Sequence, residues 1–583
     1  MGKGKVKSKI KVKQKQAKKA KNIVKKAAKI LPKTAKPAIS SKSEQKTPQK
    51  SAFPIALAQI NTTVGDIYEN FRKVVAAIES AKQSGAQLIV FPQLTITGFP
   101  PKDLLTRPDF VDVNMQRFIE IVNATKGISC IFGFVNKENN NTFNAFACVR
   151  DQKILSIQNK VHLDGCLMGS SYFAAGANPD VVLLGNQRVG VVIAEHTEEE
   201  MTFELLAAKG VDFFVVLAAS SYTLEKNTEQ YISSLAKKYR VPIAYCNHVG
   251  AQDSFIFDGG SFVVDKNGLV VSRAKKFGAD VLLVDVHKAG SSFIPPKDQG
   301  GELYNALTLG VRDYFAKAGY TKAVIGISGG LDSAVTAALA VHALGKENVI
   351  GLFLSSKMTS KESVTDAKRV FANLGLPFKA LNIDSAVTLL CRANGYKYEK
   401  KNITLAEQNI QARVRAELLM STANKNNALV LACSNKTDLA MGYFTLYGET
   451  AGALLPLGDL WKTQVYALAQ YMNALSKQKS KTNVIPDSVL KKPATAELRA
   501  GQKDSDDMPP HDVLDKVLQL YIMHKKDIHE IVKLGFDGEM VRRVAFMMMK
   551  SEFKRQQTAL PLRVSSCSFG PTWNYPIVSG WRG

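Results

Sequence analysis

The sequence predicts an α/β protein in two folded parts, a layered α/β sandwich and then a doubly wound parallel sheet, preceded by a disordered lysine-rich tail. Short apolar strands alternate with helical segments in the first half, and strand pairs flank turn signals such as Lys266-Asn267-Gly268. Near Leu303 the pattern restarts with a helix, a strand, a glycine turn and a second helix, which is how a parallel sheet opens. A length of 583 residues also exceeds what one hydrophobic core supports.

The first 50 residues differ from the rest of the chain in composition. They hold 18 lysines, a single acidic residue (Glu44) and no aromatic residue, and so carry +17 of the formal net charge of +26. Such a segment cannot bury enough apolar surface to offset the entropy of ordering, and we expect residues 1–50 to be disordered. Two interpretations stay open for this tail: a solvated polycation without a fixed partner, and non-specific binding to nucleic acid or other polyanions.

The apolar runs, the cysteine count and the composition of the tail predict a reduced, cytoplasmic protein without a membrane span. No apolar run reaches the roughly 18 residues that cross a bilayer. Seven cysteines, an odd number without a CxxC pair, argue against a disulfide framework or a zinc site. The tail lacks the apolar core of a secretory signal and the arginines of a mitochondrial presequence.

Ordered sequence is expected from Phe53, with a helix from Asn70 to Ser84. Strands are expected at residues 54–60, 88–92, 129–135, 143–150, 189–194, 213–217 and 242–247. The Pro-, Gly- and Ser-rich stretch Ala289–Gly301 is the expected boundary. The predicted division is therefore a tail (1–50), a sandwich (51–290) and a parallel-sheet domain (291–583).

A glycine-rich loop opens the second domain, between a strand at 323–327 and a helix at 333–344. Its residues are Gly326, Ile327, Ser328, Gly329, Gly330, Leu331, Asp332 and Ser333. The adjacent glycines allow close approach to a phosphate, and the helix N-terminus favours negative charge. Asp332 suits a Mg²⁺ ion that bridges phosphates. The alternative is a glycine turn that only connects two elements. The GK[ST] of a Walker A loop is absent, and the loop resembles instead that of the ATP pyrophosphatases.

Further motifs narrow this resemblance to the NAD synthetase family. The matching segments are residues 409–415 (NIQARVR), 435–443 (NKTDLAMGY), 445–449 (TLYGE), 458–463 (GDLWKT), 496–499 (AELR), 502–504 (QKD) and 552–555 (EFKR). The resemblance covers nearly the whole second half, from about Tyr304 to Trp581. It implies ATP-dependent amidation of deamido-NAD to NAD through an acyl-adenylate, with release of pyrophosphate and AMP.

The resemblance also implies a role for individual residues. ATP is expected at the glycine-rich loop and Cys433, deamido-NAD at Asn409, Asp438 and Lys554, and Mg²⁺ at Asp332, Asp438 and Glu449. Lys462 is the expected catalytic lysine, which steadies phosphate charge. Three positions depart from the family pattern: Cys433 stands where the family has threonine, Asp438 is one methylene shorter than the usual glutamate, and Ser355 stands where the family has proline.

Residues 53–287 resemble the nitrilase (carbon–nitrogen hydrolase) domain that is fused to glutamine-dependent NAD synthetases, which implies an α-β-β-α sandwich. The matching segments include residues 58–60 (AQI), 63–66 (TVGD), 97–105 (TGFPPKDLL) and 257–262 (FDGGSF). Family members hydrolyse glutamine with a glutamate base, a lysine and a cysteine nucleophile. Here Gln93 replaces the glutamate and Ala194 the cysteine, while Lys160 is retained. We therefore expect an inactive amidase domain in which Lys160 has no catalytic work, although Cys166 is a conceivable substitute nucleophile.

The resulting hypothesis is a homo-oligomeric NAD synthetase that uses free ammonia. A second hypothesis keeps glutamine as nitrogen donor, through a partner glutaminase or unconventional residues. A third is a nucleotide-binding pseudoenzyme with a regulatory role.

Overall fold

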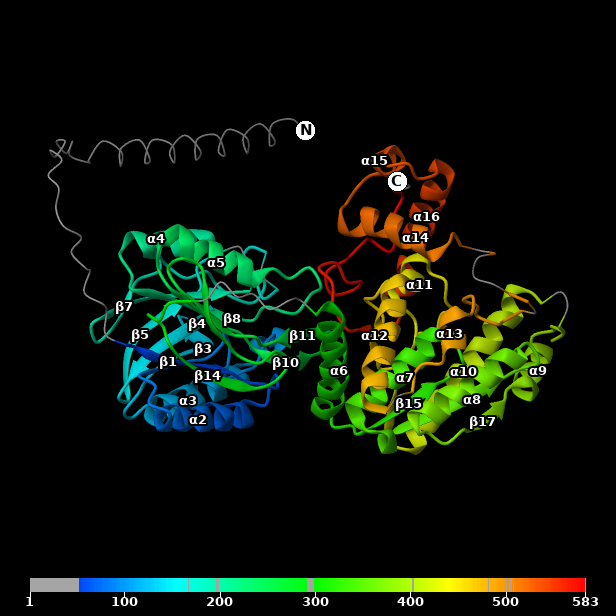
Figure 1. Ribbon diagram of the computed structural model, residues 1–583, viewed down its shortest axis with the longest axis horizontal. Helices are drawn as coiled ribbons and strands as arrows, with labels where there is room; N and C mark the ends of the chain where they lie inside the picture. The colour runs from blue at the N-terminus through cyan, green and yellow to red at the C-terminus, as the bar shows by residue number, and fades with distance from the viewer. Residues whose placement is uncertain are drawn as a thin grey trace. The chain divides into compact units, whose positions relative to one another are not determined.

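The structure is a computed structural model that describes residues 52–581, except for residues 140, 166, 196–198, 291–297, 401–402, 481, 500, 503–505 and 507. The predicted disordered tail lies outside the described residues. Figure 1 shows the arrangement of helices and strands. We call residues 52–290 the sandwich and residues 298–581 the parallel-sheet part.

The sandwich is built from two six-stranded mixed sheets. In the first sheet the order is β14 (Asp280–Asp285), β1 (Pro54–Gln59), β2 (Leu88–Val90), β3 (Ser129–Glu138), β4 (Asn141–Arg150) and β5 (Lys153–Asn159). In the second it is β13 (Val270–Arg273), β12 (Phe262–Val264), β9 (Ile243–Cys246), β8 (Phe213–Ala218), β7 (Gln187–Ala194) and β6 (Val182–Leu184). A separate hairpin joins β10 (Val249–Gln252) to β11 (Phe255–Asp258).

Helices cover the outer faces of both sheets, which gives the predicted α-β-β-α layers (Figure 1). α2 (Ile67–Gln83) and α3 (Pro108–Ala124) pack on the first sheet, and α4 (Glu200–Ala208) and α5 (Thr228–Tyr239) on the second. The alternation of side chains along β1 shows the division. Ile55 and Leu57 face the second sheet, whereas Ala56 and Ala58 face α2 and α3. Because both faces are buried, these strands are continuous apolar runs.

The parallel-sheet part contains a four-stranded sheet in which every pairing is parallel. Its strand order is β17 (Ala380–Asn382), β16 (Val349–Ser355), β15 (Lys322–Gly326) and β18 (Ala428–Val430). The helices that precede or follow these strands are α6 (Gln299–Lys317), α7 (Leu331–Leu344), α8 (Lys361–Leu374), α9 (Asp384–Ala393), α10 (Leu405–Lys425), α11 (Lys436–Met441), α12 (Lys462–Ser480) and α13 (Asp487–Lys491). Last come α14 (His511–Leu518), α15 (Ile528–Lys533), α16 (Gly538–Lys550) and α17 (Glu552–Arg555).

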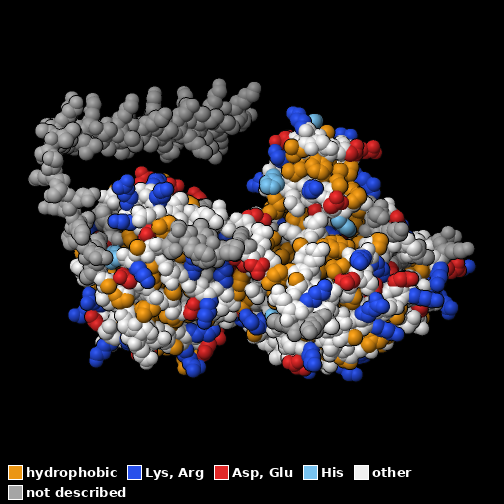
Figure 2. Space-filling view, viewed as in Figure 1, with side chains coloured by type: hydrophobic (Ala, Val, Ile, Leu, Met, Phe, Trp, Pro, Cys, Tyr) orange, Lys and Arg blue, Asp and Glu red, His pale blue; other side chains and the backbone are white. Residues whose placement is uncertain are grey.

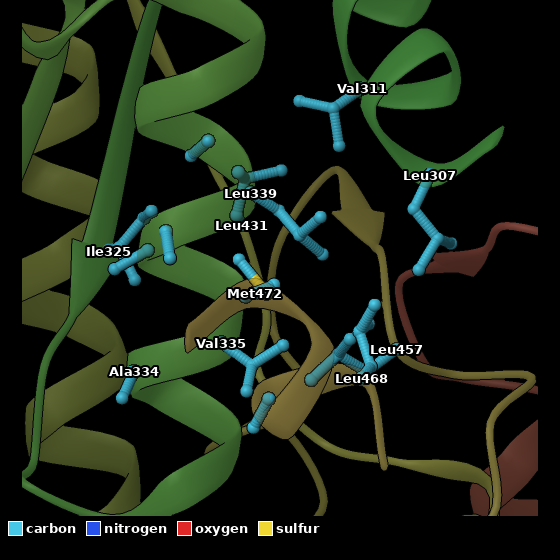
Figure 3. Close-up of a cluster of buried hydrophobic side chains, with 14 of the residues drawn as sticks. Leu307, Val311, Ile325, Ala334, Val335, Leu339, Leu431, Leu457, Leu468 and Met472 are labelled. Carbon is cyan, nitrogen blue, oxygen red and sulfur yellow. The ribbon is translucent and has the colours of Figure 1, made fainter. Parts of the chain in front are cut away.

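Helices pack on both faces of this sheet, as the doubly wound prediction requires. Figure 3 shows one face, where Ile325 of β15 meets apolar side chains of three helices. These are Leu307 and Val311 of α6, Val335 and Leu339 of α7, and Leu468 and Met472 of α12. On the other face Val324 packs with residues of α9 and α10. α6 also extends this core into the sandwich, because Ile256 and Ala251 of the β10–β11 hairpin belong to the same cluster.

The sequence located these elements to within a few residues. The helix predicted at Asn70 begins at Ile67, because the Asp66 carboxylate caps it by accepting a hydrogen bond from Glu69 N at 3.2 Å. The hairpin signal at residues 266–268 joins β12 to β13, as expected. Residues 291–297 of the predicted boundary lie outside the described residues, and the domain limits stay a prediction.

The described surface carries both signs of charge. On the face in Figure 2, lysine and arginine side chains are interspersed with acidic ones. None of the helices that the structure describes is long and apolar enough to cross a membrane.

Candidate active site

The glycine-rich loop connects the end of β15 to the start of α7, where it exposes the first backbone N–H groups of the helix. No side chain caps these groups. Within the loop, Ser333 Oγ accepts a hydrogen bond from Ser328 N at 3.2 Å and lies 3.1 Å from Ser328 Oγ. Ser328 Oγ in turn accepts from Gly330 N at 3.2 Å. The two serines therefore fix the turn and leave the helix N-terminus open to an anion.

Gly329 is the position that requires glycine. Its φ of +83° is in the left-handed region, and a Cβ atom there would lie 2.4 Å from the carbonyl oxygen of Ser363. Any other residue would push the loop away from α8.

A cluster of charges surrounds the first turn of α7. The Asp332 carboxylate contacts Lys462 Nζ at 2.6 Å through Oδ2 and accepts a longer hydrogen bond from Asn435 Nδ2 at 3.3 Å. Burial opposes the charge of Lys462, but Asp332 and Asp438 outweigh it and raise the pKa of the ammonium. Asp332 Oδ1 is buried and receives no hydrogen bond from the described residues. One carboxylate oxygen is thus available for a further cation.

These groups line a cavity of about 290 Å³. Of the residues predicted for ATP, Gly326, Ile327, Ser328, Gly330, Leu331, Asp332, Ser333 and Cys433 line it. Asp438, Glu449 and Lys462 line it as well. Burial raises the pKa of the Cys433 thiol to about 12, so the thiol is neutral. The Glu449 carboxylate accepts a hydrogen bond from Thr445 N at 2.9 Å.

The other two residues predicted for deamido-NAD lie beside the cavity and not in its lining. Asn409 Oδ1 accepts a hydrogen bond from Thr445 Oγ1 at 2.8 Å. Lys554 Nζ donates to the carbonyl oxygens of Gly442 and Phe444, both at 2.8 Å. Both side chains thus hold the segment that leads to Glu449. Their assignment to deamido-NAD stays a prediction.

The expected Mg²⁺ ligands are not gathered into one cluster. In the part of the chain that the structure describes, no group of three His, Cys, Asp or Glu side chains could hold a metal ion. Asp332 alone offers an unpartnered buried oxygen, whereas Asp438 accepts from Asn435 Nδ2 at 2.7 Å. This arrangement fits Mg²⁺, which is commonly held by one or two carboxylates with substrate phosphates and water.

Sequence reasoning missed three charged residues of the cavity lining, namely Arg415, Lys492 and Glu497. Arg415 donates to Leu354 O at 3.1 Å, and Glu497 accepts from Ser363 Oγ at 2.7 Å. Arg415 and Glu497 lie inside the matched NIQARVR and AELR segments, so the signal was present but unassigned. Lys492 pairs with Glu497 at 3.5 Å and precedes the AELR segment, where no motif marked it.

The structure also brings together the three motifs of the amidase site in the sandwich. Asn144 links two of them: its Nδ2 donates to Gln93 Oε1 at 2.9 Å, and its carbonyl oxygen accepts from Lys160 N at 2.7 Å. Lys160 Nζ reaches the third motif at Glu195, the residue after Ala194. The site is therefore assembled, but with an amide and a methyl group where a base and a nucleophile are needed.

Gln93 is buried and held on two sides. Besides the side-chain contact with Asn144, the backbone carbonyl oxygen of Gln93 lies 2.7 Å from His248 Nε2. Burial lowers the pKa of His248 to about 4, so the neutral ring donates this hydrogen bond. An amide so placed has no affinity for the proton of an attacking group.

Lys160 lies between two buried carboxylates. Its Nζ is 3.5 Å from Glu199 Oε1 and 3.7 Å from Glu195 Oε1, and all three side chains are at most 4% exposed. Burial raises the pKa of the Glu199 carboxyl, and the nearby Lys160 partly opposes this. The lysine thus serves as a counter-ion to both carboxylates. That it has no catalytic role stays a prediction. Cys166, the conceivable substitute nucleophile, lies outside the described residues.

Two family models match the chain. The NAD synthase family matches residues 303–558, and the carbon–nitrogen hydrolase family matches residues 54–292.

Relatives match over nearly their whole length. The glutamine-dependent NAD(+) synthetase of Thermotoga maritima is 35% identical, over 91% of this chain and 99% of the relative, and that of Synechocystis is 36% identical over the same shares. A solved glutamine-dependent NAD+ synthetase from Acinetobacter baumannii, in complex with ADP, has a TM-score of 0.72 at 34% identity and covers 91% of this chain and 99% of its own. A synthetase structure from Cytophaga hutchinsonii shares the fold, with a TM-score of 0.78 at 18% identity, over 91% of this chain and 98% of its own.

Replacing Lys160 by methionine should destabilise the sandwich by about 3–5 kcal/mol near pH 8, because two buried carboxylates lose their cation. The loss should be smaller near about pH 5. Burial already raises the pKa of Glu199, and without its cation this carboxylate takes up a proton there, which relieves the repulsion. Urea unfolding at both pH values measures the effect.

Lys209→Met is the matched control, since it removes a half-exposed lysine that pairs with the exposed Asp180 at 3.1 Å. It should cost at most about 1 kcal/mol at either pH. Equal losses for the two variants, or a Lys160→Met loss that does not depend on pH, would contradict the ion-pair assignment.

Proposed function

We propose that this chain, which belongs to the glutamine-dependent NAD(+) synthetase family, makes NAD with ammonia that its own amidase domain does not supply. The family membership makes it an amide-forming ligase that acts in NAD biosynthesis and uses ATP. The contrast between its two sites carries the proposal. The cavity at the glycine-rich loop keeps its charged groups, whereas the amidase site holds Gln93 and Ala194.

The reaction needs ATP because a carboxylate has no usable leaving group. A carboxylate oxygen of deamido-NAD attacks the α-phosphorus of ATP, and pyrophosphate leaves with the electrons of the broken P–O bond. The α7 N-terminus and Lys462 face the cavity in which this charge develops. Positively polarised groups so placed stabilise the departing pyrophosphate more than the bound ATP. The solved relative was obtained in complex with ADP, which supports nucleotide binding by this chain.

Asp332 Oδ1 is the group in this cavity that would hold Mg²⁺, since it is buried and has no donor among the described residues. A bound Mg²⁺ neutralises phosphate charge and orients the triphosphate. Asp332 Oδ2 meanwhile keeps Lys462 in place at 2.6 Å. The two oxygens of one carboxylate thus serve two cations.

In the second half-reaction, the lone pair of ammonia attacks the acyl carbon of the adenylate, the C–O bond to AMP breaks, and the nitrogen releases a proton. The donor must be NH₃, because ammonium has no lone pair. The sandwich of this chain offers neither a thiolate at position 194 nor a carboxylate at position 93 to release it from glutamine. We therefore assign the nitrogen to free ammonia.

A second candidate keeps glutamine as donor, because the relatives are named glutamine-dependent. It requires a partner glutaminase or an unconventional nucleophile such as Cys166. A regulatory pseudoenzyme is not supported, since the loop and the Asp332–Lys462 pair are intact. Homo-oligomerisation stays a prediction. The six described cysteines are free thiols, which supports the proposed cytoplasmic setting.

Asp332→Asn should lower ATP-dependent pyrophosphate release by about 100- to 1000-fold, because it removes both the Mg²⁺ ligand and the partner of Lys462. Pyrophosphate can be followed with a coupled phosphate assay, and circular dichroism checks the fold. Asp109→Asn, at an exposed carboxylate, is the control and should leave the rate unchanged. Near wild-type pyrophosphate release by Asp332→Asn would refute the assignment.

Purified protein should form NAD from deamido-NAD, ATP and ammonium, and should release no glutamate from glutamine. At fixed total ammonium the rate should rise from about pH 7 to about pH 8.5, in step with the fraction of NH₃. NAD and glutamate are measured in the same reactions. Glutamate released in a one-to-one ratio with NAD by the unmodified protein would overturn the free-ammonia proposal and indicate an unrecognised nucleophile.

Restoring the nucleophile alone, as Ala194→Cys, should not restore glutaminase activity, because Gln93 leaves the thiol without its base. The pair Gln93→Glu with Ala194→Cys should restore little, since Glu195 and Glu199 already engage Lys160. Glutamate release measures both variants. Full glutaminase activity in the single variant would contradict the role given to Gln93.

We propose that the tail binds polyanions and takes no part in catalysis. Deletion of residues 2–50 should leave synthetase turnover unchanged and abolish salt-sensitive retention on heparin or DNA, because it removes the excess of lysines. Elution from heparin against salt measures the second effect. A large loss of turnover would place the tail in the active unit.

A further inference from the structure

A buried ion pair next to the ATP cavity has no role in the chemistry above. Lys436 Nζ and Asp459 Oδ1 lie 2.8 Å apart, and both side chains have an exposed fraction of 0%. Two unsolvated charges are costly unless further hydrogen bonds satisfy them. The other hydrogen-bond partners of Lys436 and Asp459 indicate the structural role of this ion pair.

Those partners come from one segment near the chain end, residues 562–567, which we call the brace. Asp459 Oδ2 accepts hydrogen bonds from Val564 N at 2.8 Å and Ser565 N at 2.7 Å, and Asp459 Oδ1 accepts from Ser565 Oγ at 2.9 Å. Lys436 Nζ donates to Ser565 Oγ at 2.8 Å and to Cys567 O at 2.7 Å. The ion pair is therefore complete only with the brace in place.

The brace is itself held by the sandwich. Arg563 N donates to Ser254 O at 2.8 Å, and Arg563 Nη1 donates to Ser221 Oγ at 3.1 Å. The guanidinium also lies over the ring of Phe255, and the residue is only 8% exposed. Two further contacts follow along the brace: Leu224 N donates to Val564 O at 2.8 Å, and Ser566 N donates to Glu225 Oε2 at 3.1 Å.

At its other side the ion pair adjoins the ATP cavity. Lys436 is the first residue of α11, and its neighbour Asn435 caps that helix and reaches Asp332 Oδ2 at 3.3 Å. The next residue, Thr437, accepts a hydrogen bond at Oγ1 from Lys462 N at 2.9 Å. The start of α11 thus sets the position of both members of the Asp332–Lys462 pair.

We propose that the brace makes the sandwich a structural part of the synthetase site, in which Arg563 acts as a positioning residue for ATP. Contacts of the sandwich fix the brace, the brace completes the Lys436–Asp459 pair, and the pair fixes the α11 start against Asp332 and Lys462. A sandwich without glutaminase chemistry is then still required for adenylation. This inference rests on the proposed ATP site.

The test compares steady-state constants of the full-length protein with ammonium as donor. Arg563→Met should raise the KM for ATP and the half-saturating Mg²⁺ concentration by about tenfold, and should leave the KM for ammonia within about twofold of wild type. A general loss of stability would lower the fraction of active enzyme, and therefore kcat, but it would not raise the KM for ATP relative to the KM for ammonia. Arg563→Lys keeps the charge and a donor, so its increase should be smaller.

Ser221→Ala with Glu225→Ala gives a milder second variant, which removes two sandwich contacts without removing the buried charge of Arg563. This variant should raise the KM for ATP severalfold. It replaces Arg563→Met in the experiment if Arg563→Met does not fold. Asn61→Ala is the matched control. It removes a contact between the same two parts of the chain, from Asn61 Nδ2 to Asp313 Oδ2 at 2.8 Å, that does not involve the brace. Its KM for ATP should stay unchanged.

An ATP KM within about twofold of wild type in the folded brace variants would refute the proposal. An equal rise in Asn61→Ala would refute it too, because loosening of any contact between the two parts would then suffice. Wild-type protein that forms no NAD at all would instead contradict the proposed function.

Discussion

The cavity of the parallel-sheet part depends on one topological constraint, the reversal of strand order at β15. The chain passes from β15 to β16 on one side, and later returns to pair β18 on the other side, with all strands parallel. Loops that leave the carboxyl ends of β15 and β18 therefore diverge and open a crevice between them. Ser328 follows the first strand and Cys433 the second, and both line the cavity. Placement of a nucleotide site here follows from strand order before any side chain is considered.

The sequence predicted what is local in the chain. The loop, its strand and its helix were readable because glycine at position 329 and an apolar run in β15 act within a few residues. The start of α7 lies at Leu331, two residues before the predicted start, because the first turn already includes Asp332. Lys462, the predicted catalytic lysine, and the three amidase positions could be proposed because each lies inside a short motif.

Sequence reasoning could not find the contacts that join distant segments. Lys160 was assigned as a retained catalytic lysine, but its pairing with Glu199 depends on how β7 leads into α4. The brace could likewise not be predicted from the sequence, because Arg563 and Ser221 come into contact only when both folded parts have formed. Buried charges carry no periodicity, and their partners are set by the tertiary fold. Motifs therefore predicted the reacting groups, and packing shows which residues contact them.

The proposed loss of amidase catalysis is compatible with a fold that is kept. Glutamine at position 93 has nearly the shape of glutamate, and its Oε1 still accepts from Asn144. Alanine at position 194 is small and apolar at a strand end that packs in a hydrophobic cluster. Lys160 keeps its charge balanced by Glu195 and Glu199. Gln93 and Ala194 are both uncharged, so neither leaves an unpaired buried charge, although Gln93 Nε2 is buried without a hydrogen-bond partner among the described residues. Stability alone would thus tolerate the loss of chemistry, but it would not explain why the whole sandwich persists. Contacts from Ser221 and Ser254 to Arg563 give a physical reason, because they connect the core of the sandwich to the residues around Asp332.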